Sequence, residues 1–151
     1  MDSRRRVKVP DGIVFLILLV VGLVARIPFL GNFDLVAYDG TYYINQARSF
    51  LGWSAAGGSF PVGYPAMIAL FLPLVRDGVR AAQAVSLLAA IGSIWIVYLL
   101  ARRHVSRFNA FLAALLLVLT PLFLRLSMMT LSESVFVFWL LLGLVTACLN
   151  G

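Results

Sequence analysis

One short apolar stretch decides the fold of this chain: Tyr64-Pro65-Ala66-Met67-Ile68-Ala69-Leu70-Phe71-Leu72-Pro73-Leu74-Val75. A helix needs about 17–25 residues to cross a hydrocarbon core that is about 30 Å thick. This stretch offers twelve residues, and two of them are prolines. We therefore expect it to form a re-entrant or interfacial helix that enters the membrane from the outer side and returns.

The rest of the chain has the composition of an integral membrane protein. Of its 151 residues, 62% are hydrophobic and 12% are charged, whereas soluble domains are about 45–50% apolar and about 25% charged. Longer apolar runs predict a single all-α domain, residues 1–151, with about four transmembrane helices. These runs are residues 13–30, 81–101, 108–124 and 134–149.

The net charge of +6 reflects membrane topology. Arginines and lysines stand in short clusters at the ends of apolar runs and not along a polar face, so we expect no nucleic-acid partner. The basic cluster Arg4–Lys8 before the first run also fits a secretory signal peptide with cleavage near Ala25. We favour a first span with a cytoplasmic N-terminus, because the apolar run continues to Leu30 and further spans follow. The single cysteine, Cys148, gives no disulfide framework and no thiol metal site.

The positive-inside rule does not settle the number of spans. With Arg26, inside the first span, left out, seven basic residues lie inside and four outside whether the short stretch crosses or returns. Its length therefore remains the stronger criterion. With four spans, residues 31–80 form an outer loop, and Asp39 and Glu133 face the same side. Within that loop, the spacing of apolar residues from Thr41 to Leu51 predicts an amphipathic helix at the membrane surface.

Several short patterns, taken together, resemble the GT-C glycosyltransferases. They are Arg26 near the outer end of the first span, Asp39 followed by Tyr42 and Ala47-Arg48, the turn Pro61-Val62-Gly63-Tyr64-Pro65, and Thr120-Pro121 followed by Thr130-Leu131-Ser132-Glu133. Within that superfamily the likeness is to the protein O-mannosyltransferase and aminoarabinose-transferase branch, and it runs from Val24 to Leu149. One departure is Gly40, which stands where many relatives carry a second acidic residue.

The resemblance implies a transferase that moves a sugar from a polyprenyl-phosphate carrier to a lipid, glycan or protein acceptor on the outer face of a membrane. It assigns Asp39 as the catalytic base of an inverting reaction and Glu133 as a second acidic site residue. It also implies a bacterial plasma-membrane location. The chain would be the N-terminal part of a longer glycosyltransferase and inactive by itself.

Each candidate residue also has a plain structural explanation. Asp39 could cap the surface helix that begins near Thr41, and Glu133 could form a capping box with Thr130. Arginines on the outer side would stabilise a departing phosphate, and tyrosines would line the carrier or sugar site. For substrate binding we select Arg26, Tyr42, Tyr43, Arg48, Tyr64 and Arg80.

The alternatives to these binding roles remain open. Snorkelling to the interface explains Arg26, and interfacial belts explain Tyr64 and Tyr98. No metal is predicted to be obligatory, because Glu133 has no histidine nearby, although a divalent ion remains an alternative. Two other functions also stay open: a non-catalytic membrane scaffold and a small transporter subunit.

Overall fold

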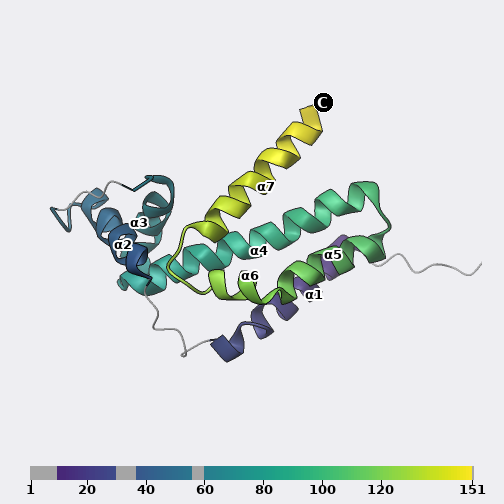
Figure 1. The fold of residues 1–151 in the computed structure, drawn as a ribbon, viewed down its shortest axis with the longest axis horizontal. Coiled ribbons are helices and arrows are strands. Elements are labelled where there is room, and N and C mark those ends of the chain that lie inside the picture. The colour runs from purple at the N-terminus through teal and green to yellow at the C-terminus, as the bar shows by residue number, and fades with distance from the viewer. Residues whose placement is uncertain (1–9, 30–36, 56–59, 151) are drawn as a thin grey trace, which may run out of the picture.

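The computed structural model describes residues 10–29, 37–55 and 60–150, and this part of the chain contains helices and no strands. The all-α expectation is confirmed. The predicted outer loop, residues 31–80, falls partly outside the described residues. In chain order the helices are α1 (Asp11–Val24), η1 (Ile27–Phe29), α2 (Tyr38–Phe50), α3 (Gly63–Val75), α4 (Gly78–His104), α5 (Arg107–Leu119), α6 (Pro121–Leu126) and α7 (Glu133–Asn150) (Figure 1).

Helix α4 is the central helix of the structure. Its 27 residues extend for about 40 Å at 1.5 Å per residue. Two apolar clusters pack against it, one after the other along its length. The cluster on residues 81–89 is completed by α2, α3 and the beginning of α7. The cluster on residues 90–98 is completed by α1, α5 and α6. Accordingly, α2 and α3 lie together beside the beginning of α4, while α1 and α5 run along its second half (Figure 1).

Polar contacts join the C-terminal end of α4 to its neighbours. The hydroxyl of Tyr98 donates to the Asp11 carboxylate at 2.5 Å, and Arg107 lies 3.1 Å from the same carboxylate oxygen. These bonds join the beginning of α1, the last turns of α4 and the beginning of α5. Tyr98 is fully buried, so its predicted place in an interfacial belt is wrong. The basic turn between α4 and α5 therefore lies at the opposite end of the molecule from α2 and α3.

Two helical segments in the described chain are long and apolar enough to cross a membrane: residues 11–29, which combine α1 and η1, and α4. Three apolar helices are shorter: Gly63–Val75, Arg107–Leu119 and Glu133–Cys148. The expected run 108–124 is broken between α5 and α6, because Pro121 disfavours the helical conformation of the residue before it. Thr120 is accordingly extended, with ψ at 117°. Two of the four predicted spans are thus confirmed as helices of sufficient length.

The stretch that decided the topology forms α3, as predicted. Its 13 residues extend for about 20 Å, which is short of a bilayer core of about 30 Å. Near the beginning of α3, Tyr64 donates to the carbonyl of Ala82 at 3.0 Å, so α3 lies along only the first turns of α4. It ends at Val75, and the left-handed backbone of the next residue, Arg76, with φ at 59°, turns the chain toward α4. This arrangement favours a helix that stays at one end of the bundle.

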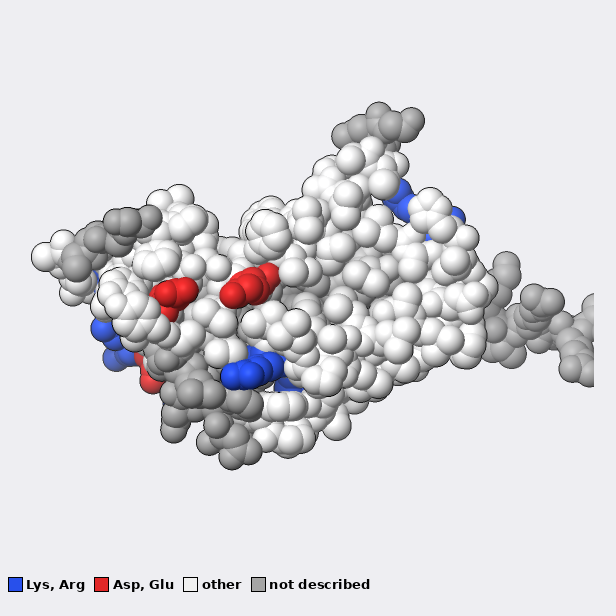
Figure 2. Space-filling view, viewed as in Figure 1, with Lys and Arg blue, Asp and Glu red and all other residues white. Residues whose placement is uncertain are grey.

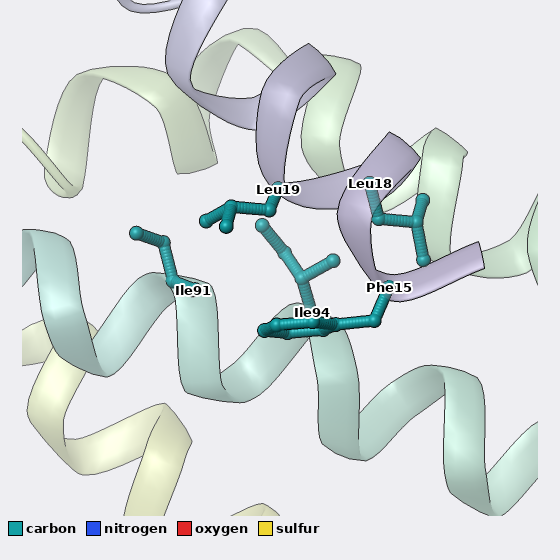
Figure 3. A pocket seen from close by; sticks show the side chains of 5 residues that line it. All are labelled: Phe15, Leu18, Leu19, Ile91 and Ile94. Carbon is teal, nitrogen blue, oxygen red and sulfur yellow. The ribbon is translucent and has the colours of Figure 1, made fainter. Parts of the chain in front are cut away.

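A small hollow between α1 and α4 is lined by apolar side chains (Figure 3): Phe15, Leu18, Leu19, Ile91 and Ile94. Its volume is about 10 Å³, which is close to the least that holds one water molecule. It is therefore a packing defect in the seam between the two helices and not a substrate site.

Candidate active site

Asp39 lies in the first turn of α2. The helix begins at Tyr38, three residues earlier than predicted, and its N-cap is Ala37, which makes no side-chain cap hydrogen bond. The expectation that Asp39 caps the helix is therefore wrong. Its carboxylate is exposed, and the positive end of the helix dipole favours a negative charge there by about 0.3–1 kcal/mol.

Gly40 brings this turn against the segment that precedes α7. A Cβ atom at Gly40 would lie 2.8 Å from the carbonyl oxygen of Thr130 and would also overlap its side chain. One turn later, the Tyr43 hydroxyl lies 3.3 Å from the Ser132 Oγ. Because Asp39 adjoins Gly40, and Glu133 adjoins Ser132, both acidic residues lie at the same end of the structure. On the face in Figure 2, the acidic side chains all gather at the end formed by α2, α3 and the beginning of α7, with basic side chains beside them.

Glu133 is the first residue of α7, and its side chain is exposed. The predicted capping box with Thr130 is wrong, because the Thr130 hydroxyl is buried and has no hydrogen-bond partner in the described structure. Thr130 instead packs against Gly40. The carboxylate of Glu133 is thus not engaged by the cap that the sequence predicts.

Arg26 has a different position from the one expected. It does not snorkel to an interface: its side chain is only 2% exposed. Its Nε donates to the Ser127 Oγ at 2.8 Å, its Nη1 donates to the Gly22 carbonyl at 2.7 Å, and its guanidinium lies 5.9 Å from the centre of the Phe123 ring. Arg26 therefore ties the end of α1 to the segment that leads to Glu133 through Nε and Nη1, whereas its buried Nη2 has no hydrogen-bond partner among the described residues.

The other candidate arginines are exposed. Arg48 is in the last turn of α2 near Gly78, about 14 Å along the helix from Asp39. Arg80 pairs with Asp77 at 4.0 Å in a solvated turn, an arrangement that typically contributes little to stability. Arg125 is exposed in the last turn of α6, close in the chain to the Arg26–Ser127 contact.

Three candidate tyrosines at this end differ in burial: Tyr42 is the most exposed, whereas Tyr43 and Tyr64 are buried. Tyr42 is partly exposed; its hydroxyl lies 2.9 Å from that of Tyr38, and this hydrogen bond is the main cause that raises the pKa of Tyr42, with a smaller contribution from the charge of Asp39. Tyr43 is buried between Phe60 and Tyr64.

Tyr64 packs against Tyr43 and is 4% exposed, so it does not face outward as a residue of an interfacial belt would. Burial raises the pKa of Tyr64, and the charge of Glu133 adds to that rise. The Tyr64 ring therefore lies within electrostatic reach of Glu133, yet behind Tyr43.

Sequence reasoning missed the roles of two residues at this end, Ser86 and Ser132, and gave no structural reason for a third, Gly40. Gly40 was noticed as a departure from the resembled family, and its missing side chain now has a physical reason, since no Cβ fits against Thr130. Ser86 and Ser132 make long-range hydrogen bonds for which the sequence carries no local signal. Among residues 10–29, 37–55 and 60–150, no three His, Cys, Asp or Glu side chains gather in a way that could hold a metal ion.

Comparison with known proteins gives one match. Residues 59–149 match the family model for dolichyl-phosphate-mannose-protein mannosyltransferases; this range includes Glu133 but not Asp39. No curated protein and no solved structure matches the chain. The matched range covers more than half of the 151 residues and includes α3, α4, α5, α6 and most of α7. The chain therefore belongs to the dolichyl-phosphate-mannose-protein mannosyltransferase family and is an integral membrane protein of the GT-C glycosyltransferase type.

Proposed function

We propose that this protein transfers a sugar from a polyprenyl-phosphate-linked donor to an acceptor hydroxyl at the outer face of the membrane, with Asp39 as the general base. The observation that carries this proposal is the contact between Gly40 and Thr130. It places Asp39 and Glu133 at one end of the structure, away from the basic turn between α4 and α5. Family membership supports sugar transfer in general.

The proposed chemistry is a single displacement at the anomeric carbon. The acceptor oxygen attacks that carbon from the side opposite the phosphate, and the bond between the carbon and the phosphate oxygen breaks, which inverts the configuration. Asp39 takes the acceptor proton, and the polyprenyl phosphate leaves with the bonding electrons. A hydroxyl is a weak nucleophile, and a positioned base typically contributes about 10²–10⁴-fold to such a step.

Other residues at this end have supporting roles in the proposal. Glu133 would accept a hydrogen bond from the acceptor or the sugar, and the exposed edge of Tyr42 would contact the sugar or the carrier. Positive charge for the departing phosphate would come from Arg125, which is exposed, and from the buried charge of Arg26 behind it. Arg48 and Arg80 would attract anionic headgroups at a greater distance from Asp39.

We further propose that the reaction needs no obligatory metal ion. Carboxylates prefer to hold Mg²⁺ or Ca²⁺ in groups with other oxygen ligands, and Gly40 stands where a second adjacent acid would complete such a pair. The location that fits this chemistry is the outer face of a plasma membrane, such as that of a bacterium, with the N-terminus inside. The acceptor would be a lipid, a glycan or a protein that offers a hydroxyl group.

The test of the proposed function is a donor comparison. The protein is expressed from its full reading frame, and membranes containing it are supplied with one of three labelled donors: dolichyl-phosphate-mannose, undecaprenyl-phosphate-mannose, or GDP-mannose together with an inhibitor of carrier loading. We expect label to enter product from at least one polyprenyl-phosphate donor and not from GDP-mannose. Nuclear magnetic resonance of the product should give inverted anomeric configuration. Transfer directly from GDP-mannose, or retained configuration, would contradict the proposal.

A further inference from the structure

Two hydroxyl groups from different helices contact the short segment that carries Glu133, and a third, from another helix, contacts one of them. Tyr43 of α2 contacts Ser132, Ser86 of α4 donates to the carbonyl of Leu131 at 3.1 Å, and Tyr64 of α3 lies 2.9 Å from the Ser86 Oγ. Tyr64 and Ser86 are both buried. Buried polar groups of this kind are normally fully hydrogen-bonded, and they hold their partners in one arrangement.

The bond from Ser86 to Leu131 departs from the usual behaviour of serine in a helix. Within a helix a serine hydroxyl commonly donates to the carbonyl four residues earlier. Ser93, further along α4, does so: it donates to the Ala89 carbonyl at 2.8 Å. The corresponding acceptor for Ser86 is the carbonyl of Ala82. That carbonyl already receives the hydroxyl of Tyr64 at 3.0 Å.

Counting protons explains why Ser86 turns outward from its own helix. Tyr64 and Ser86 each have one hydroxyl proton to donate. Since the Tyr64 proton is directed to the Ala82 carbonyl, the Ser86 proton is left free for the carbonyl of Leu131. Without the Tyr64 hydroxyl, the Ala82 carbonyl would again be open to Ser86, and Leu131 would lose its donor.

We propose that the Tyr64 hydroxyl is a positioning group: by occupying the Ala82 carbonyl it directs Ser86 onto Leu131 and so fixes the segment that carries Glu133, at the end of the structure where Asp39 lies. This inference rests on the proposed function for its catalytic consequence, but its structural part does not. It assigns Tyr64 a role that differs from substrate binding, because Tyr64 lies behind Tyr43 and acts through Ser86.

The test is amide hydrogen exchange in the full chain, comparing Tyr64→Phe and Ser86→Ala with the control Ser93→Ala. Tyr64→Phe keeps the ring and removes only the hydroxyl. We expect exchange of the amides in residues 131–136 to become about tenfold faster in both variants, as loss of one typical hydrogen bond predicts. The double variant should exchange no faster than either single variant, because both break the same link. Ser93→Ala should leave this segment unchanged. Wild-type exchange in Tyr64→Phe would overturn the proposal.

A kinetic measurement separates this proposal from the proposed function. With dolichyl-phosphate-mannose as the donor, Tyr64→Phe should lower kcat roughly 10- to 100-fold, since a misplacement of about 1 Å has effects of that order. Its KM for the donor should stay near the wild-type value. A raised KM with an unchanged kcat would make Tyr64 a binding residue and overturn the positioning role. If Asp39→Asn retains wild-type turnover, the proposed function fails, while the exchange result stands.

Discussion

Asp39→Asn is expected to lower the turnover of sugar transfer by about 10²–10⁴-fold while the protein still folds and inserts. Asparagine has nearly the same shape as aspartate, but it cannot accept the acceptor proton at neutral pH. The effect on stability should be small, because Asp39 is exposed in the first turn of α2 and its interaction with the helix dipole amounts to about 0.3–1 kcal/mol. The measurement is initial rate in membranes with matched protein levels.

Asp77→Asn is the matched control for this experiment. Asp77 is a second exposed carboxylate at the same end, where it caps α4 by accepting a hydrogen bond from the backbone N–H of Arg80. Asparagine caps a helix about as well as aspartate, so the control should keep both its stability and its turnover. A properly inserted Asp39→Asn protein with wild-type turnover would exclude the general-base role of Asp39.

Gly40→Ala is expected to damage both stability and turnover. The new Cβ would lie 2.7 Å from the Cβ of Thr130 and 2.8 Å from its carbonyl oxygen, and the second of these is backbone that cannot rotate away. Overpacking of this kind typically costs about 1–3 kcal/mol. The start of α2 must then move away from the segment before α7, which separates Asp39 from Glu133, and we expect roughly 10²-fold lower turnover.

Thermal unfolding and initial rates of the same preparation measure the two effects. The control is Gly143→Ala in α7, where a Cβ meets nothing within 4 Å; alanine there should be neutral or stabilising, by about 0.5–1 kcal/mol. Thr130→Ala should restore Gly40→Ala only in part, because the Cβ and the carbonyl oxygen of residue 130 remain. Wild-type stability and turnover in Gly40→Ala would show that the contact does not hold the two acidic residues together.

Much of the helical framework follows from the sequence, because apolar runs and prolines act locally. The runs predict α1, α4 and α7 to within a few residues, and the two prolines correctly predict a short α3. The break before Pro121 was also readable, since proline restricts the residue that precedes it. It was missed because the apolar run continues across it.

Only the part of the candidate site that depends on charge and on the order of the spans could be predicted from the sequence. The placement of Asp39 and Glu133 at one end follows from the alternation of spans. The burial of Arg26, Tyr64 and Tyr98 was not predicted, since each depends on partners that lie far away in the sequence: Ser127, Ser86 and Asp11. From the sequence, an arginine or tyrosine near the end of a span is expected to snorkel to the interface or to join an aromatic belt. Only the packing of the helices shows which of these side chains are buried inside the bundle.

The central claim is that α3 does not cross the membrane, so that Asp39 and Glu133 face one compartment. The contact of Gly40 with Thr130, which keeps Asp39 and Glu133 at one end of the structure, supports this claim. Its most direct test is cysteine labelling of intact cells with a membrane-impermeant maleimide, in a Cys148→Ser background that removes the native thiol. Single substitutions at exposed positions report on each side: Asn45→Cys before α3, Arg80→Cys after it, and Arg103→Cys at the far end of α4.

We predict that the thiols of Asn45→Cys and Arg80→Cys react in intact cells, and that the thiol of Arg103→Cys reacts only after the membrane is permeabilised. If α3 crosses, the last two results exchange: Arg103→Cys is labelled from outside together with Asn45→Cys, and Arg80→Cys is protected. That result would place Asp39 and Glu133 on opposite sides of the membrane and contradict the account.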